Sequence, residues 1–200
     1  DEVDEAYIDR FLPLYHANIA TKDHPQFFNV KEKVLKSPHD TPYQAISLHN
    51  GTKYQGGFIF GLREGCLSAA YKVFPKELDI PLPINITFVA EYYFYKYALM
   101  QKKSFVYHGL GLNCFGQSAS IGLAMFKLQA GAVPIVSALT KNQILQQFEW
   151  DGAEDTLVFE GTEGQLKKGK LFLTGKHPIE KYSILLKHPE LQIETILATG

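Results

Sequence analysis

The sequence contains few of the residues that proteins use to bind metals or to clamp anions. Its two cysteines, Cys66 and Cys114, lie far apart, which matches neither a disulfide framework nor a zinc site. We expect two buried thiols in a reducing compartment. Of the 20 basic residues only Arg10 and Arg63 are arginine, so bidentate arginine clamps must be scarce. A bound phosphate would then be held by lysine, backbone N–H groups or a helix N-terminus.

Long apolar runs and secretion signals are missing too. The longest uncharged stretch, residues 104–126, is too polar in its middle to span a bilayer. The chain starts with acidic residues rather than with a secretory signal. Because residue 1 is not methionine, we expect a trimmed chain or a part of a longer protein. The net charge of −1 gives no general attraction to nucleic acid, and we predict a cytoplasmic protein without a membrane span.

Common catalytic signatures are absent as well. The sequence has no Gly-x-Ser-x-Gly elbow, no phosphate-binding P-loop and no His-x-x-x-His pair. These absences argue against a serine hydrolase, a nucleoside triphosphatase and a zinc enzyme. No metal site is expected.

What the chain does contain is a regular succession of helical and strand patterns. They predict an α+β fold, in which a mixed, mostly antiparallel sheet is flanked by helices. Pro13 lies inside the first helix and is expected to kink or split it. Asn50-Gly51 predicts a tight hairpin. The predicted helices are 4–20, 23–37, 87–101 and 118–131, and the predicted strands are 43–49, 53–62, 66–72, 104–108 and 132–139.

The long helix 87–101 and the C-terminal segment carry further expectations. Glu91 is expected to interact with the helix dipole. Strands 104–108 and 132–139 flank a helix and are expected to share one sheet. We predict a first domain over 1–140 and a C-terminal, β-rich extension over 141–200. The predicted buried stripe of the long helix is Phe88, Tyr92, Tyr95 and Leu99, and the extension is predicted to form strands 155–160, 170–174 and 191–198 and a helix over 177–187.

Several motifs follow one another in a characteristic order. A hairpin ends in Gly56-Gly57-Phe58-Ile59-Phe60, and the strand 66–71 comes next. A long helix with Ala90, Tyr93 and Tyr97 follows, and the stretch Gly122–Gly131 then contains Phe126-Lys127-x-x-x-Gly131. With these motifs, residues 5–136 resemble the FemAB-like branch of the GNAT acyltransferase superfamily, and the Phe-Lys-x-x-x-Gly stretch is similar to the signature that closes this family's domain.

The resemblance implies a GNAT-like fold in which a splayed mixed sheet holds an acyl donor. It also implies transfer of an acyl or aminoacyl group from an activated ester to a primary amine. The donor would be an acyl-CoA or an aminoacyl-tRNA, with no other cofactor. The acceptor would be a small-molecule or peptide amine, and tRNA would be a partner in the aminoacyl case.

Two departures from the family pattern leave an alternative open. The loop before the long helix, residues 80–85, has no glycine, so it lacks the motif that grips the pyrophosphate of coenzyme A. The segment Val106-Tyr107-His108-Gly109 lacks the aspartate that often precedes this glycine. The alternative is a catalytically degenerate GNAT-fold module that serves binding or structure in a larger protein. A third, weaker reading is a hydrolase that uses His108.

Three residues are the catalytic candidates. Lys127 lies about 110° from the centre of its helix's apolar stripe and would stabilise a developing negative charge. His108 ends a strand beside a glycine-rich loop and would act as general base for the attacking amine. Tyr107 would donate a proton to the leaving group. The alternatives without a catalytic role are a solvated lysine for Lys127, a hydrogen-bonded histidine for His108 and a core tyrosine for Tyr107.

A second group of residues is expected to contact the substrate. Asn113, Gln117 and Ser118 precede a helix N-terminus and would bind an anion or a sugar, or else serve as turn and cap residues. The run Lys167-Lys168-Gly169-Lys170 is either a solvated hairpin tip or a weak tRNA contact. The substrate-binding candidates are Tyr71, Lys72, Asn113, Gln117, Ser118 and Phe126.

Overall fold

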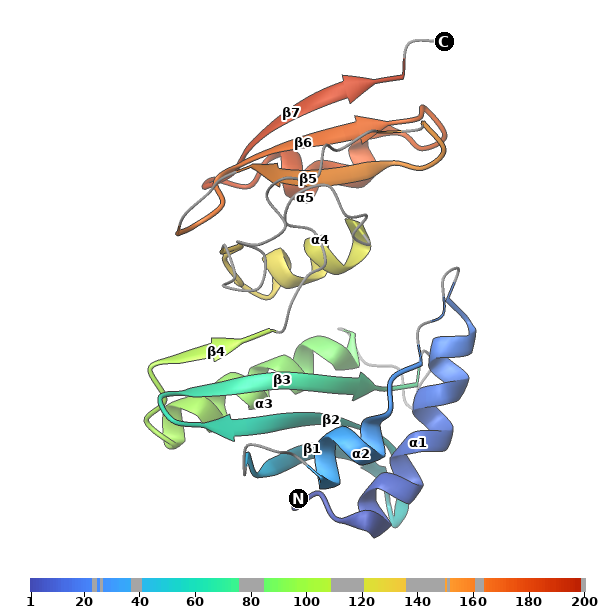
Figure 1. The fold of residues 1–200 in the computed structure, drawn as a ribbon, viewed down its shortest axis with the longest axis vertical. Coiled ribbons are helices and arrows are strands. Elements are labelled where there is room, and N and C mark those ends of the chain that lie inside the picture. The colour runs from blue at the N-terminus through green and yellow to red at the C-terminus, as the bar shows by residue number, and fades with distance from the viewer. Residues whose placement is uncertain are drawn as a thin grey trace. The chain divides into compact units, whose positions relative to one another are not determined.

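The computed structural model describes residues 1–22, 25, 27–36, 41–75, 85–108, 121–135, 150, 152–160 and 164–198 (Figure 1). The chain divides into two compact units, Asp1–Gly109 and Leu110–Gly200. Each unit has a sheet and a hydrophobic core of its own, and each is described by itself.

The first unit is a four-stranded sheet with helices on both faces. Strands β1, β2 and β3 form an antiparallel meander, and β4 pairs with β3 in parallel, so the sheet order is β1-β2-β3-β4. The elements are α1 (Glu5–Ala20), α2 (Val30–Leu35), β1 (Tyr43–Asn50), β2 (Lys53–Arg63), β3 (Cys66–Val73), α3 (Ile86–Met100) and β4 (Phe105–Tyr107).

The side chains of β2 point alternately to the two faces of this sheet, and different helices cover each face. Ile59 packs in the core that α1 and α2 cover, while Phe58 and Phe60 pack in the core that α3 covers. Successive strand residues point to opposite faces, so one apolar strand can serve two cores. A register shift between Ile59 and Phe60 leaves Ala70 of β3 unpaired as a bulge.

Side-chain caps explain where the helices of this unit begin. Asp4 accepts the N–H of Tyr7 at 2.7 Å, and Asn29 and Asn85 cap α2 and α3 in the same way. The cap at Asn29 starts α2 later than the predicted residue 23. The helix α1 contains Pro13 and still runs from Glu5 to Ala20, so of the two predicted effects, a kink or a split, the split does not occur.

The second unit is a three-stranded sheet with helices. Strand β6 pairs antiparallel with β5 and parallel with β7, and the short helices η2 and α5 lie in the β6–β7 connection. Parallel neighbours require such a crossover connection. The elements are α4 (Ile121–Gln129), β5 (Thr156–Glu160), β6 (Lys168–Leu173), η2 (Ile179–Tyr182), α5 (Ser183–Leu186) and β7 (Gln192–Leu197).

Helix α4 packs within the second unit. Its residues Ile121 and Leu128 are buried in one cluster with Leu157 of β5 and Leu171 of β6. The boundary between the two units, after Gly109, lies before the boundary predicted from the sequence at residue 140, which would place α4 in the first domain.

The predicted strand 132–139 is only partly within the described residues. Ile135 forms an isolated antiparallel bridge with Gln165, and Leu166 donates its N–H to the carbonyl of Pro134 at 2.8 Å. These contacts lie inside the second unit, so residue 135 pairs there rather than with strand β4. Residues 136–139 lie outside the described part of the chain.

The coarse fold class is therefore confirmed. The structure is a mixed α+β arrangement whose strands are mostly antiparallel and whose helices flank the sheets. None of the helices that the structure describes combines the length and the apolar character needed to cross a membrane.

Candidate functional site

A buried carboxylate on α3 organises the polar cluster of the first unit. Glu91 is only 2% exposed and lies on the sheet-facing side of the helix, with Ala90, Phe94 and Ala98. The first turn of α3 holds no acidic residue, so the expected role of Glu91 at the helix dipole was wrong. A buried carboxylate is costly unless cations and donors surround it.

Lys72 of β3 supplies the nearest positive charge. Its ammonium forms an ion pair with Oε1 of Glu91 and also lies 4.5 Å from the ring centroid of Phe58. Lys72 and Phe58 are cross-strand partners, which sets the ammonium over that ring. The lysine stem therefore packs on the α3 face of the sheet while its charge meets the carboxylate.

His108 follows β4 directly and completes the cluster from the other side. Its side chain is 7% exposed, and its Nδ1 lies 3.8 Å from Oε2 of Glu91. Its Nε2 lies 2.8 Å from the hydroxyl of Tyr95 on α3. The parallel pairing of β4 with β3 carries the chain to this position, because Tyr107 is opposite Ser68 in the register.

The second oxygen of Glu91 has an unused capacity to accept a hydrogen bond. Oε2 is buried and receives none from any residue that the structure describes. The 3.8 Å distance to Nδ1 of His108 is within ion-pair range but too long for a hydrogen bond. Buried acceptors are normally satisfied, so an orphaned carboxylate oxygen marks a place where a donor is expected to bind.

Tyr95 is held in its protonated form. Burial disfavours the phenolate and the negative charge of Glu91 opposes it further, which together raise the pKa of Tyr95 to about 12. A protonated Tyr95 can donate to Nε2 of His108 when the imidazole proton is on Nδ1, the nitrogen that faces Glu91. Tyr95 and His108 are thus joined by a hydrogen bond, and Glu91 lies within ion-pair range of the same imidazole.

The structure brings together only part of the residues predicted from sequence. Lys72 and His108 both lie in this cluster, around Glu91. Tyr71 is next to Lys72 but faces the opposite side of the sheet, where its ring packs edge-on against Tyr15 at 5.8 Å. The reason is again the alternation of side chains along a strand.

The remaining candidates lie elsewhere or outside the described residues. Tyr107 is half-buried in β4. Phe126 and Lys127 lie on α4, in the second unit, so the structure does not join them to the Glu91 cluster. Asn113, Gln117 and Ser118 lie outside the described part of the chain.

Glu91 and Tyr95 are the functional candidates that sequence reasoning missed. They are four residues apart on α3, a spacing that places two side chains on one face of a helix. The predicted buried stripe had put Tyr95 with Tyr92 and Leu99, both of which are exposed in the structure. The buried face is instead marked by the small residues Ala90 and Ala98, which allow the helix to approach the sheet closely.

The cluster lacks the composition of a metal site. Among the described residues, no three histidine, cysteine, aspartate or glutamate side chains are grouped so that they could hold a metal ion.

Comparison with protein-family models, with curated proteins and with solved structures finds no match to this chain. A function for this protein is therefore inferred from the chemistry of the cluster itself.

Proposed function

We propose that the protein is an N-acyltransferase whose first unit carries the proton-transfer site, formed by Glu91, His108 and Tyr95. The observation that carries the proposal is the buried carboxylate oxygen of Glu91, which faces Nδ1 of His108 and lacks a donor among the described residues. An amine acceptor offers N–H donors of the kind that this oxygen lacks. The order of helices and strands in the first unit is compatible with the GNAT-like fold that the resemblance implies.

The reaction is aminolysis of an activated ester. The amine nitrogen attacks the acyl carbon and forms a C–N bond, and the bond from that carbon to the leaving oxygen or sulfur breaks. The proton that the amine loses passes through the Tyr95 hydroxyl to His108, where the nearby Glu91 carboxylate stabilises the imidazolium. The imidazolium then returns the proton to the leaving group.

The donor follows from the same proposal. It is an acyl-CoA or an aminoacyl-tRNA, the acceptor is a small-molecule or peptide amine, and the reaction takes place in the cytoplasm. Lys127 of α4 lies in the second unit and stays a separate prediction, made from the sequence, for a cation that stabilises charge on an acyl oxygen.

A second candidate is a non-catalytic, GNAT-like binding module. The observation in its favour is that Lys72 already neutralises Glu91 and that His108 is almost fully buried. In that case the polar cluster serves the fold alone, and its substitution lowers stability without changing a reaction.

The test is a thermal-shift panel followed by single-turnover assays. The panel contains coenzyme A, acetyl-CoA, long-chain acyl-CoA, a charged tRNA and a cell-wall nucleotide precursor, and a ligand at about 100 times its Kd stabilises by roughly 2.7 kcal/mol. With the donor that binds, His108→Gln is expected to lower acyl transfer about 10²-fold or more. Lys127→Ala is expected to lower it more than about tenfold.

The matched control is Tyr92→Phe, because Tyr92 is an exposed tyrosine on the same helix. It should leave turnover unchanged, whereas Tyr95→Phe should lower it. Undiminished transfer by folded His108→Gln would remove the histidine from the mechanism. Absence of binding and turnover with every donor would favour the non-catalytic module.

A further inference from the structure

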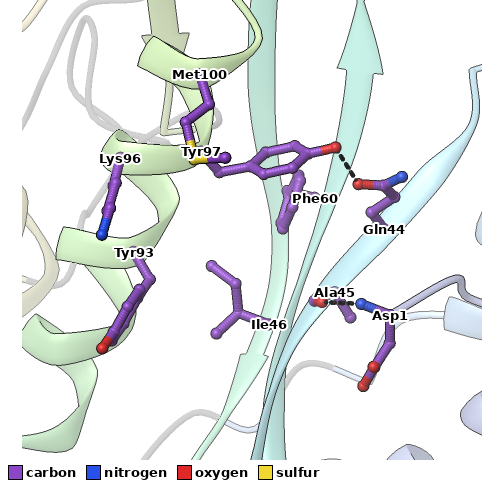
Figure 2. Close-up of a pocket in the computed structure, with 9 residues that line it drawn as sticks. All are labelled: Asp1, Gln44, Ala45, Ile46, Phe60, Tyr93, Lys96, Tyr97 and Met100. Carbon is purple, nitrogen blue, oxygen red and sulfur yellow. Dashed lines mark hydrogen bonds between the residues drawn. The ribbon is translucent and has the colours of Figure 1, made fainter.

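A pocket of about 380 Å³ lies between α3 and the edge strand β1 of the first unit (Figure 2). The spacing of its residues on α3 is i, i+3, i+4 and i+7, which places them on one strip of the helix. On β1 the pocket is lined by Gln44, Ala45 and Ile46. Gln44 and Ile46 are two residues apart and therefore lie on the same face of the strand. The residues on α3 are Tyr93, Lys96, Tyr97 and Met100.

The floor of this pocket is fixed by packing and by a hydrogen bond. Phe60 is buried beneath it, and its ring centroid lies 5.5 Å from that of Tyr97. The Tyr97 hydroxyl donates to Oε1 of Gln44 and so joins the helix wall to the strand wall, as Figure 2 shows. A floor held from both sides is already formed before a ligand arrives, which reduces the cost of binding.

The rim leaves apolar and aromatic surface uncovered. Tyr93 is 50% exposed and Met100 is 69% exposed, although both face the pocket. A volume of this size is within the range of small-molecule sites. A flat, apolar ligand would remove this surface from water and gain the corresponding hydrophobic free energy.

The rim also carries one positive charge on the helix side. Lys96 is exposed, and no salt bridge between described residues includes it. On the strand side, the carboxylate of Asp1 accepts a hydrogen bond from Ser47. Lys96 is therefore the positively charged side chain that a ligand would meet on the helix side of the pocket.

We propose that this pocket binds a small planar aromatic carboxylate. The ring lies over Tyr97 between Tyr93 and Met100, and the carboxylate contacts the ammonium of Lys96. The proposal is independent of the acyltransferase site, because Tyr93 and Tyr95 are two residues apart and therefore point about 200° away from each other around α3.

The test compares two probes of the same shape. The probes are 2-naphthoate, which carries the carboxylate, and 2-naphthalenemethanol, which does not. Their Kd values are measured by ¹H–¹⁵N NMR titration of the 200-residue chain. We expect saturable shifts at the amides of α3 and β1 with both probes, and tighter binding of the carboxylate.

Matched variants test which residues contact the carboxylate of the ligand and which contact its ring. Lys96→Gln should weaken naphthoate binding by up to about fivefold, which is the upper end of what one exposed ion pair contributes, and should leave the alcohol unaffected. Lys53→Gln, an exposed lysine on β2, is its control. Tyr93→Ala should weaken both probes, and Leu99→Ala, on the exposed part of the same helix, should weaken neither.

The outcomes separate this proposal from the proposed function. Shifts that do not saturate, or that lie away from α3 and β1, would overturn the pocket as a binding site. An equal effect of Lys96→Gln and Lys53→Gln would overturn the role of the carboxylate. Naphthoate should bind His108→Gln with unchanged Kd, so failure of the acyltransferase proposal leaves this result intact.

Discussion

The hydroxyl of Tyr95 lies 2.8 Å from Nε2 of His108, which joins the middle of α3 to the residue that follows β4. On the other side of the imidazole, Nδ1 faces the buried carboxylate of Glu91. Both Tyr95 and Glu91 come from one helix face, so α3 holds the histidine at both ring nitrogens. Contacts at both nitrogens favour one orientation of the imidazole ring.

The raised pKa of Tyr95 predicts a pH dependence of stability. Its folded-state pKa of about 12 lies above the ordinary value near 10, so the folded state keeps a proton that the unfolded state loses. This contribution is complete below pH 10 and is lost as the pH rises from about 10 to 12. Urea unfolding at pH 9 and pH 11 should show a smaller loss of stability in Tyr95→Phe than in the wild type.

The same tyrosine should report on the charge of Glu91. Substitution of Glu91 by glutamine removes a negative charge that opposes the phenolate, so the pKa of Tyr95 should fall. The measurement is the titration of ¹³Cζ-labelled tyrosine, with Tyr95→Phe used to assign the resonance. An unchanged or higher pKa would contradict the electrostatic contact between the two side chains.

The Lys72–Glu91 ion pair should be strongly coupled. Removal of one partner leaves a charge in a buried site, so Lys72→Met alone is expected to cost about 3–5 kcal/mol of unfolding free energy. The double variant Lys72→Met/Glu91→Leu leaves no uncompensated charge and should recover much of this loss. The double-mutant cycle is measured by urea unfolding, and additive single costs would contradict the coupling.

A surface ion pair supplies the comparison. Lys31 bridges Glu5 at 2.7 Å, and both side chains are well exposed. Exposed pairs typically contribute about 0–1 kcal/mol, so Glu5→Gln should change stability far less than Lys72→Met. A similar cost for the two substitutions would show that burial does not govern the Lys72–Glu91 pair.

The meander of the first unit could be predicted from local signals. Asn50-Gly51 has the sequence of a tight hairpin, and Gly51 has the positive φ of 57° that such a turn requires. Alternating apolar residues then define the strands on both sides of the turn. These signals act within a few residues, and the observed strands match them closely.

The buried face of α3 and the polar cluster depend on contacts between distant parts of the chain. Aromatic residues occur nearly all around α3, so apolar spacing alone selects the wrong stripe. Glu91 is buried only because Lys72 of β3 and His108, which follows β4, meet it there. The packing of α4 in the second unit is likewise decided by contacts with β5 and β6, which no local pattern encodes.

Gly57 should be intolerant of any side chain. A Cβ at this position would meet the hydroxyl of Tyr7 and would lie 2.8 Å from that of Tyr54. We therefore expect Gly57→Ala to cost about 1–3 kcal/mol of unfolding free energy, as overpacking usually does. Hydrogen exchange of β2 amides measures the loss. The double variant Gly57→Ala/Tyr7→Phe, which lacks the first obstructing hydroxyl, should lose less than the sum of the single variants.

Asp155 should make the second unit sensitive to acid. Burial alone would raise its pKa, but hydrogen bonds from the side chains of Thr174 and Tyr182 and from the Thr174 N–H hold the pKa of this carboxyl below its ordinary value. The stabilisation is therefore present above pH 4 and is lost as the pH falls through the lowered folded-state pKa.

The sole tryptophan, Trp150, allows this acid sensitivity to be measured in the second unit. Its ring packs on Phe172 of β6 at 5.3 Å, so its fluorescence should follow the unfolding of that sheet. Between pH 5 and pH 2 we expect Asp155→Asn to lose less stability than the wild type, because asparagine has no proton to gain. Glu180→Gln, at an exposed residue of η2, should follow the wild-type curve. If Asp155→Asn follows it too, the hydrogen bonds at Asp155 do not control the acid response.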